Sequence, residues 1–318
     1  MRRALLACAL LAAPVGAPVD AWAGQAYVTN QGDDSLSVVD TATGAVTQTV
    51  QVGSKPAGVA VGPGGRVYVT NPEGRSITVL DCRDGRLFAV AEVPAGAGPL
   101  GVAASPRDGR VFVADWYGDT VAVLDPGSLA ITGTVKVGQS PSGLAVSPDG
   151  ARLYVANRES DTLSVIDLAT LGTVATVPVG HAPFGVTLQG GRVFVANVQS
   201  GDVSVLDAAT LTETRRVKVG EFPYAVAVTP DGSRMFVTNQ HSGTLSVFDG
   251  AFTPLPDIDV GDYPEGIAMS ADGARAWVAV WMDNRLAEID VAAGKVVRRI
   301  KVGESPRAFG TFLAPPTE

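Results

Sequence analysis

The sequence of 318 residues has few of the side chains that form disulfides or transition-metal sites: two cysteines and two histidines. Cys8 lies in the N-terminal apolar stretch, so Cys82 alone is left in the rest of the chain and an internal disulfide is excluded there. His181 and His241 lie far apart in the chain, without the spacing typical of zinc ligands. We therefore expect stability without disulfides, and we expect no metal.

Positive charge and catalytic motifs are also scarce. The formal net charge is −8 and no cluster of Lys and Arg occurs, which disfavours nucleic acid as a partner. The chain has no G-x-S-x-G elbow, no recognisable Ser-His-Asp order and no evident His partner for Cys82. Its glycines mark turns, since no helix follows them to hold a phosphate. We expect no catalytic residue and no cofactor.

Residues 1–23 have the pattern of a secretory signal peptide. Arg2 and Arg3 precede an apolar stretch over 4–13, and Ala21 and Ala23 form an A-x-A cleavage site before Gly24. Cleavage after Ala23 removes two Arg and one Asp, so the net charge changes from −8 to −9. No other stretch is long enough to span a membrane. The sequence predicts a periplasmic or secreted monomer whose single domain covers residues 24–318.

One phrase is repeated seven times along that domain. It reads Tyr27-Val28-Thr29-Asn30 in the first copy and returns with spacings of 41, 44, 42, 40, 42 and 41 residues. The later copies begin at Tyr68, Phe112, Tyr154, Phe194, Phe236 and Trp277. The fourth copy shows four strand-like segments, at 153–157, 162–167, 172–177 and 185–188, which leave no room for a long helix. This period predicts an all-β, seven-bladed β-propeller with four-stranded antiparallel blades.

Two further sets of residues recur once per repeat. A proline precedes each fourth segment, usually with Gly two positions later: Pro56, Pro99, Pro141, Pro183, Pro223, Pro264 and Pro306. An aspartate ends each middle segment: Asp40, Asp81, Asp125, Asp167, Asp207, Asp249 and Asp290. Proline fixes φ, glycine allows backbones to approach closely, and aspartate accepts hydrogen bonds from turn amides. We interpret both sets as structural.

The pattern resembles the YVTN-repeat, YncE-like family of β-propellers, down to the turn Ser147-Pro148-Asp149-Gly150. In that family the strand after Pro-x-Gly lies innermost. The resemblance therefore implies that residues 308–313 form an innermost strand, complete the first blade and close the ring.

A functional site is expected where the repeats differ. The loops after the aromatic phrase and the loops carrying the prolines share one face, because neighbouring strands alternate in direction. The candidate binding residues on that face are Trp116, Tyr117, Arg158, His181, Phe184, Tyr224, His241, Tyr263, Glu265, Trp281, Asp283 and Arg307. Phe184 and Tyr224 are expected to form an aromatic wall opposite a Glu265–Arg307 pair at the axial mouth. The alternative is that Glu265 and Arg307 simply neutralise each other and that the aromatic side chains only pack within the loops.

The sequence leaves several functions open. The first hypothesis is a non-enzymatic binding propeller for a small molecule or a periplasmic partner protein, and the resemblance implies a link to quinone-cofactor (PQQ) dependent oxidation. Propellers similar to this one also serve as lactone hydrolases, as a lyase, as the large subunit of amine dehydrogenases and as haem d1-binding proteins. A haem would need His181 or His241 as its ligand. Joint replacement of Trp281, Tyr224 and Arg307 is expected to abolish binding with little change in melting temperature.

Overall fold

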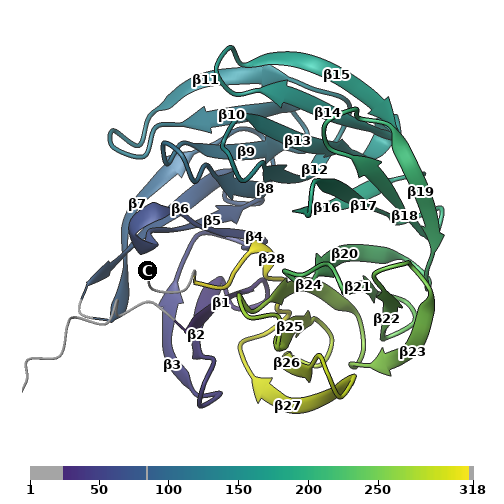
Figure 1. Cartoon of the computed structure of the whole chain (residues 1–318). Coiled ribbons are helices and arrows are strands. Elements are labelled where there is room, and N and C mark those ends of the chain that lie inside the picture. Colours follow the sequence, from purple (N-terminus) through teal and green to yellow (C-terminus); the bar gives the residue numbers. More distant parts are fainter. Residues whose placement is uncertain (1–23, 84, 315–318) are drawn as a thin grey trace, which may run out of the picture.

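Seven small antiparallel sheets stand around a common axis (Figure 1). The computed structural model describes residues 24–83 and 85–314; the predicted signal peptide lies outside the described residues. Within them, the helical segments are two 3-10 turns, η1 (Pro63–Gly65) and η2 (Arg158–Ser160). None of the described helices is long and apolar enough to cross a membrane. The predicted seven-bladed propeller is confirmed.

Each blade runs from an inner strand near the axis to an outer strand at the rim. The inner strands are β4 (Gly58–Val61), β8 (Pro99–Ala104), β12 (Pro141–Val146), β16 (Pro183–Gln189), β20 (Pro223–Val228) and β24 (Pro264–Met269). The second strands are β1 (Gln25–Asn30), β5 (Val67–Asn71), β9 (Val111–Asp115), β13 (Arg152–Asn157), β17 (Arg192–Asn197), β21 (Arg234–Asn239) and β25 (Arg275–Val280).

The third strands are β2 (Ser35–Asp40), β6 (Ser76–Arg83), β10 (Thr120–Leu124), β14 (Thr162–Asp167), β18 (Asp202–Asp207), β22 (Thr244–Asp249) and β26 (Arg285–Asp290). The outer strands are β3 (Val46–Gln51), β7 (Arg86–Pro94), β11 (Ile131–Lys136), β15 (Gly172–Pro178), β19 (Glu213–Lys218), β23 (Pro254–Asp259) and β27 (Lys295–Lys301). We number the blades along the chain, so that blade 1 holds β1–β3, blade 2 holds β4–β7 and blade 7 holds β24–β27.

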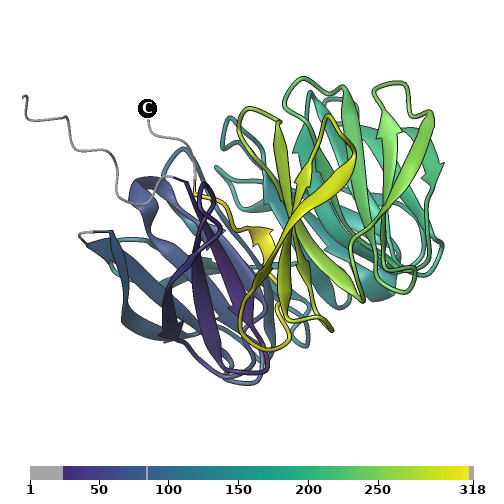
Figure 2. The same ribbon diagram turned by 90° about the horizontal axis from the view of Figure 1, so that it is seen from below.

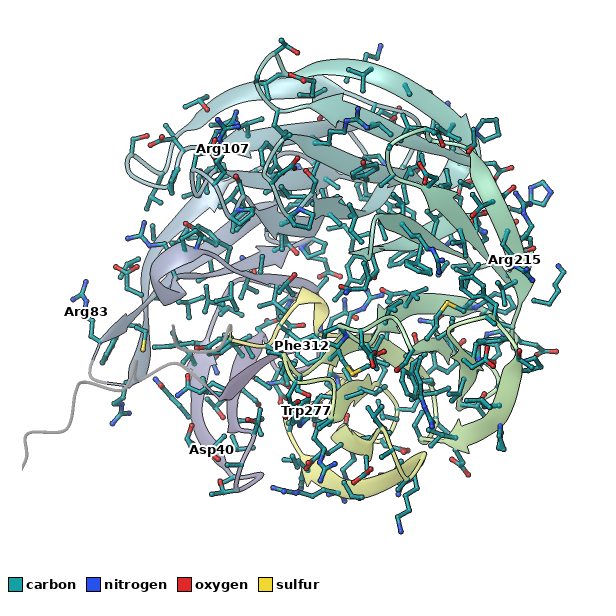
Figure 3. All side chains as sticks on the ribbon, viewed as in Figure 1. Asp40, Arg83, Arg107, Arg215, Trp277 and Phe312 are labelled. Atoms are coloured by element: carbon teal, nitrogen blue, oxygen red, sulfur yellow. The ribbon has the colours of Figure 1, made fainter. Side chains whose placement is uncertain are left out.

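The core lies between blades, because each sheet has a neighbour on both faces. The second and third strands are therefore buried almost throughout, whereas outer strands such as β19 are mostly exposed. The aromatic residue of the repeated phrase is fully or almost fully buried in every blade, as in Tyr27 and Phe236. Figure 3 shows the same division, with Arg83 and Arg215 directed outward at the rim and Phe312 inside the ring. Burial of these side chains is the main favourable contribution to folding.

The asparagine of the phrase joins two strands of its own blade to the connection from the preceding blade. In blade 4 the Asn157 amide donates to the hydroxyls of Thr162 (3.0 Å) and Ser164 (2.9 Å), and it accepts from the N–H of Gly138 (3.1 Å). A Cβ on Gly138 would lie 2.7 Å from the Asn157 side chain, so the glycine of the Val-Gly step is needed for this contact. The repeat thus keeps an asparagine and a glycine that are in direct contact. Blades 3 and 7 depart from it, with Asp115 and Val280 in the place of Asn.

The recurring Asp and Gly residues have the structural roles that the sequence predicts. Asp167 accepts from the backbone N–H groups of Ala169 (3.0 Å) and Thr170 (2.9 Å) in the turn that follows its strand. Gly185 lies so close to the next inner strand that a Cβ would be 2.5 Å from the Tyr224 carbonyl oxygen. Small residues after the proline therefore let the inner strands converge.

The C-terminal segment closes the ring between β1 and β4, as Figures 1 and 2 show in yellow. Pro306 pairs with Asn30, Leu313 pairs with Ala26, and the Tyr27 N–H donates to the Phe312 carbonyl at 2.8 Å. Between these two antiparallel bridges the segment bulges away from β1, and β28 (Phe309–Thr311) pairs in parallel with β4. Gly310 permits the bulge, since its φ is 115°. The predicted closure is confirmed, and the same segment joins the first two blades.

Cys82 is half-buried. It lies within β6, which continues to Arg83, beyond Asp81 where the sequence pattern ends the middle segment. The reason is that the β6–β7 hairpin of blade 2 is longer than the repeat implies.

Phe312 provides a test of ring closure, because its ring is fully buried against blade 1 and blade 7 side chains. We expect Phe312→Ala to lower the free energy of global unfolding by about 3–5 kcal/mol. The control is Thr311→Ala, in the same segment but exposed, which should change it by less than about 0.5 kcal/mol. Denaturant unfolding measures both. Equal stability of the two variants would mean that the segment frays without opening the ring.

The aspartates of the turns predict how stability depends on pH. Hydrogen bonds from backbone N–H groups lower the pKa of Asp40, Asp167 and Asp249, and bonds from Thr229 and Ser233 lower the pKa of Asp231 to about 2. Carboxylates whose pKa is lower in the folded state stabilise it while ionised, so this contribution is lost as pH falls below the ordinary value of 3.8. The melting temperature should therefore be steady above about pH 4 and fall towards about pH 2. In Asp231→Asn the acid decline should be shallower; a melting temperature independent of pH over this range would contradict the assignment.

Candidate functional site

Two cavities open at the two ends of the axial channel. The one on the face of the proline loops has a volume of about 530 Å³ and is called the mouth pocket here. It is lined by Gln31, Gly32, Lys55, Pro72, Glu73, Gly98, Leu100, Trp116, Tyr117, Phe184, Trp281, Ser305 and Arg307. These residues come from loops after second strands and loops before inner strands, so the structure confirms that both kinds of loop share a face.

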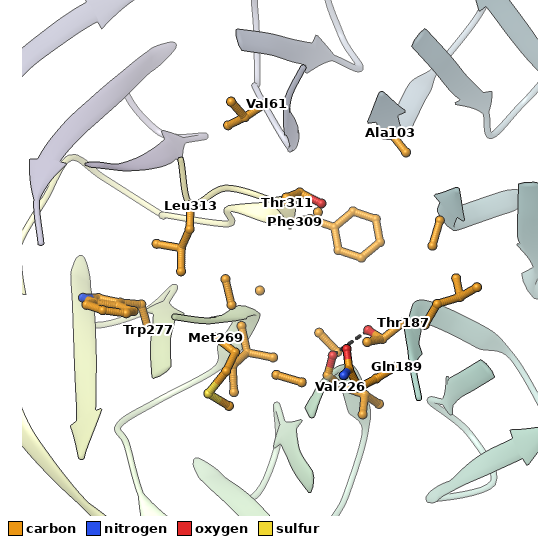
Figure 4. A pocket seen from close by; sticks show the side chains of 18 of the residues that line it. Val61, Ala103, Thr187, Gln189, Val226, Met269, Trp277, Phe309, Thr311 and Leu313 are labelled. Atoms are coloured by element: carbon orange, nitrogen blue, oxygen red, sulfur yellow. Dashed lines mark hydrogen bonds between the residues drawn. The ribbon is translucent and has the colours of Figure 1, made fainter. Parts of the chain in front are cut away.

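The opposite cavity is larger, at about 850 Å³, but chemically plainer. Figure 4 shows its walls, formed by inner strands and by the C-terminal segment with Phe309, Thr311 and Leu313. Two of its polar side chains already bond main-chain carbonyls: Thr187 donates to Val226 (2.6 Å) and Gln189 to Pro230 (2.7 Å). Aliphatic side chains and strand backbone make up most of the remainder. Its lining has fewer charged groups to orient a ligand than the mouth pocket.

Three aromatic rings separate the cavities. The Phe184 centroid lies 4.2 Å from that of Tyr224 and 4.9 Å from that of Phe309, and Tyr224 and Phe309 are 5.5 Å apart. Phe184 lines the mouth pocket and Phe309 lines the opposite cavity. All three are buried, and rings at these distances and tilts attract one another. They form a rigid floor under the mouth pocket.

Beside this floor, Arg307 is held by two partners. Its Nε donates to Glu265 Oε2 at 2.8 Å and its Nη2 donates to the Tyr224 hydroxyl at 2.5 Å. Gln240 donates to the other Glu265 oxygen at 2.9 Å. The Glu265 side chain is 5% exposed, and that of Arg307 is 19% exposed. A buried carboxylate of this kind is stable only while its cation and its hydrogen bonds are kept.

The protonation states of this cluster follow from its surroundings. Burial, and then the nearby Glu265 carboxylate, raise the pKa of Tyr224 well above its ordinary value. Burial opposes the charge of Arg307, but Glu265 and Tyr224 outweigh it and raise the pKa of the guanidinium. At neutral pH the cluster therefore contains a neutral phenol and a cationic Arg307.

The wall of the mouth pocket is aromatic. Trp116 lies 6.4 Å from Phe184, and the guanidinium carbon of Arg158 lies 5.8 Å from the Trp116 ring centroid. Tyr117 packs over Gly98, leaving the tyrosine 75% exposed. Trp281, in the loop after β25, supplies another part of the lining. The pocket therefore presents several flat apolar faces to a ligand.

The structure separates the predicted site residues into three sets. Those that line the mouth pocket are Trp116, Tyr117, Phe184, Trp281 and Arg307. Those that support the lining from behind or beside it are Arg158, Tyr224 and Glu265. Those outside it are His181, His241, Tyr263 and Asp283.

The residues outside the pocket have partners of their own. His241 stacks on Phe222 at 3.8 Å, and its Nε2 lies 2.7 Å from the Tyr263 hydroxyl; Tyr263 in turn lies 5.8 Å from Trp281. His181 pairs with Asp161 at 2.8 Å and is largely exposed. Asp283 lies against Gly261. Across residues 24–83 and 85–314, no three His, Cys, Asp or Glu side chains are grouped so as to hold a metal ion.

Lys55 and Glu73 line the mouth pocket but were not among the candidates. Lys55 directly precedes Pro56, has a φ of 54°, and is fixed by a bond from its N–H to Asp34 Oδ1 at 2.8 Å. The residue before each proline varies between repeats, and that variation is the sequence signal that marks Lys55.

Burial changes one expectation from the sequence. Tyr224 is 3% exposed and belongs to the largest apolar cluster, and Arg307 neutralises a buried carboxylate. Both side chains therefore support the fold as well as the pocket. We now expect their replacement to destabilise the protein, contrary to the small change predicted for the joint variant with Trp281.

Two family models match the central part of the chain. One, described as YNCE-like beta-propeller, matches residues 176–255, and one described as Lactonase, 7-bladed beta-propeller, matches residues 128–209. The resemblance to YncE-like propellers is thereby confirmed. No curated protein matches the sequence.

Solved structures with the same fold have varied activities. The periplasmic gluconolactonase PpgL of Pseudomonas aeruginosa is similar with a TM-score of 0.77 and 20% identity, over 92% of this chain and 99% of that one. Hydrazine synthase of Kuenenia stuttgartiensis has a TM-score of 0.76 and 19% identity, over 90% of this chain and 99% of that chain. The dihydro-heme d1 dehydrogenase NirN has a TM-score of 0.66 and 16% identity, over 93% of this chain and 76% of that chain. At these identities the likeness shows the fold alone.

The Glu265–Arg307 pair gives a testable difference between buried and surface ion pairs. Arg307→Ala leaves the Glu265 carboxylate buried without its cation, and it should lower the free energy of unfolding by about 3–5 kcal/mol. The control is Arg216→Ala, which removes an exposed pair with Glu213 on β19 and should cost at most about 1 kcal/mol. Chemical denaturation measures both. If the two variants were equally stable, Arg307 would have no role in holding the floor together.

Proposed function

We propose that this protein is an exported, non-enzymatic binding propeller that holds a small molecule in the mouth pocket. The observation that carries the proposal is the pocket itself: aromatic side chains and two cations converge from several blades above a closed floor. A concave site with apolar walls and a few placed polar groups is typical of small-ligand binding.

The rigidity of the site supports the proposal. Arg307 is fixed by Glu265 and Tyr224, and Phe184 is fixed by two further rings. A ligand therefore meets side chains that have already lost their conformational freedom, which reduces the entropic cost of binding. None of these contacts belongs to the recurring Asn, Asp and Gly residues that build every blade.

The cellular setting is also part of the proposal. The signal-peptide pattern of residues 1–23 favours the periplasm, where a structural relative, the P. aeruginosa gluconolactonase, is named as acting. Following the family resemblance, the protein is also proposed to act beside a quinone-cofactor oxidation system. Flat aromatic walls with cations suit the ligands of such a system, and a partner protein could dock on the same face.

An enzymatic function is the second candidate, favoured by the match to the seven-bladed lactonase model. The titratable side chains that line the mouth pocket are Lys55, Glu73, Tyr117 and Arg307, and a hydrolytic mechanism would have to use these. A haem would need His181 or His241, which lie outside the pocket. Turnover of lactones, aldehydes or amines, or a Soret band in protein from its native host, would replace the binding proposal.

The test compares small molecules that copurify with the protein from its native host. We expect native mass spectrometry to detect one bound compound on the wild type, and its loss from the double variant Lys55→Gln/Tyr117→Ala, whose residues are not core. The control Gln189→Ala/Thr311→Ala alters the opposite cavity and should keep the compound. Retention by the first variant and loss from the second would place the site at the other end of the channel.

A further inference from the structure

One cation in the mouth pocket has no ion-pair partner within the part of the chain that the structure describes. Lys55 and Arg307 are cationic, and Glu73, exposed at the edge, is the one carboxylate in the lining. Among the ion pairs of the described residues, none involves Lys55 or Glu73, so the lysine is not neutralised by its neighbour. The protein as a whole is acidic, with a net charge of −8. Because Glu265 neutralises Arg307, Lys55 is the cation of this lining that has no ion-pair partner among the described residues.

Arg307 has hydrogen-bonding capacity left. A guanidinium carries five N–H donors, and the bonds to Glu265 and Tyr224 use one on Nε and one on Nη2. The Nη1 group makes no hydrogen bond to the described residues and is not among their buried unpaired atoms. Because Arg307 lines the pocket, these donors are available to a ligand held there.

The rest of the lining is suited to a flat ring. Trp116, Phe184 and Trp281 present aromatic faces, and Leu100 adds an aliphatic one. Aromatic side chains bind planar rings by offset or edge contacts and give little energy to flexible polar chains. The pocket volume of about 530 Å³ admits a molecule of one or two rings.

We propose that the ligand is a small organic acid with a flat ring, whose carboxylate bonds Arg307 and Lys55 and whose ring packs against Trp116 and Trp281. This inference rests on the proposed function and specifies its ligand. The Arg307 fork matches a carboxylate in shape, and charge-assisted bonds of this kind are about twice as strong as neutral ones. A cationic ligand would be repelled by Lys55, whose charge no carboxylate of the described residues pairs. A neutral ring would leave the lysine ammonium without a counter-charge.

The experiment uses acids and amides of matched shape: benzoate with benzamide, nicotinate with nicotinamide, and 2-naphthoate with 2-naphthamide. Calorimetric titration of the purified protein gives the affinities. We expect at least one acid to bind about tenfold or more tightly than its amide. Its affinity should fall as salt is raised, because screening weakens the attraction. Tryptophan fluorescence should change with binding, since Trp116 and Trp281 line the pocket.

A matched pair of lysine variants tests the position of the carboxylate. Lys55→Gln should weaken binding of the acid about tenfold and leave the amide unchanged. Lys136→Gln makes the same charge change on the outer strand β11 and should alter neither. If Lys55→Gln and Lys136→Gln have equal effects, the carboxylate is not bound where we place it.

The remaining outcomes separate this inference from the function on which it rests. If amides bind as tightly as acids, the pocket is a ligand site and the anionic ligand is wrong. If no acid or amide binds up to about 10 mM but a copurifying compound is found in the pocket, the ligand class is again wrong while the binding function stands. If neither a copurifying compound nor a titrated one binds, both proposals fail.

Discussion

The constraint on which the structure depends is the convergence of seven inner strands on one axis. The strands can meet only if their backbones nearly touch, and a Cβ on Gly58, Gly101, Gly143, Gly185 or Gly266 would overlap the neighbouring blade. These glycines replace side-chain packing at the centre with contact between main chains. The larger side chains are thereby moved outward into the spaces between blades, where the phrase aromatics are buried.

The same constraint links ring closure to the site. The C-terminal segment must bridge blade 1 and blade 2, and it leaves β1 after Ala308 to pair with β4 over Phe309–Thr311. That path carries Arg307 to the mouth pocket and Phe309 to the three-ring floor. A segment that seals the fold therefore also supplies a cation and a ring to the site. Loss of closure and loss of the pocket are expected to occur together.

Repetition explains why the candidate site is at the mouth. Contacts that build every blade, such as the close approach of Gly138 to Asn157, recur in most repeats and leave those positions little freedom. Beyond these recurring contacts, the loops on the pocket face differ in sequence from blade to blade. In blade 7, Val280 replaces the asparagine and Trp281 follows it, so the departure from the repeat and the pocket lining coincide.

The sequence by itself determined the number of blades, the strands of each blade and which loops share a face, because these depend on local contacts that recur at a fixed period. It also identified Phe184 with Tyr224, and Glu265 with Arg307, as neighbours across blades. Only the tertiary structure decided which of the variable residues share a cavity. Tyr224 and Glu265 proved to be buried supports, His241 and Tyr263 joined a separate stack, and Lys55 entered the pocket. Those outcomes depend on how loops of different blades tilt over the axis, and on a bulge at Gly310 that no repeat encodes.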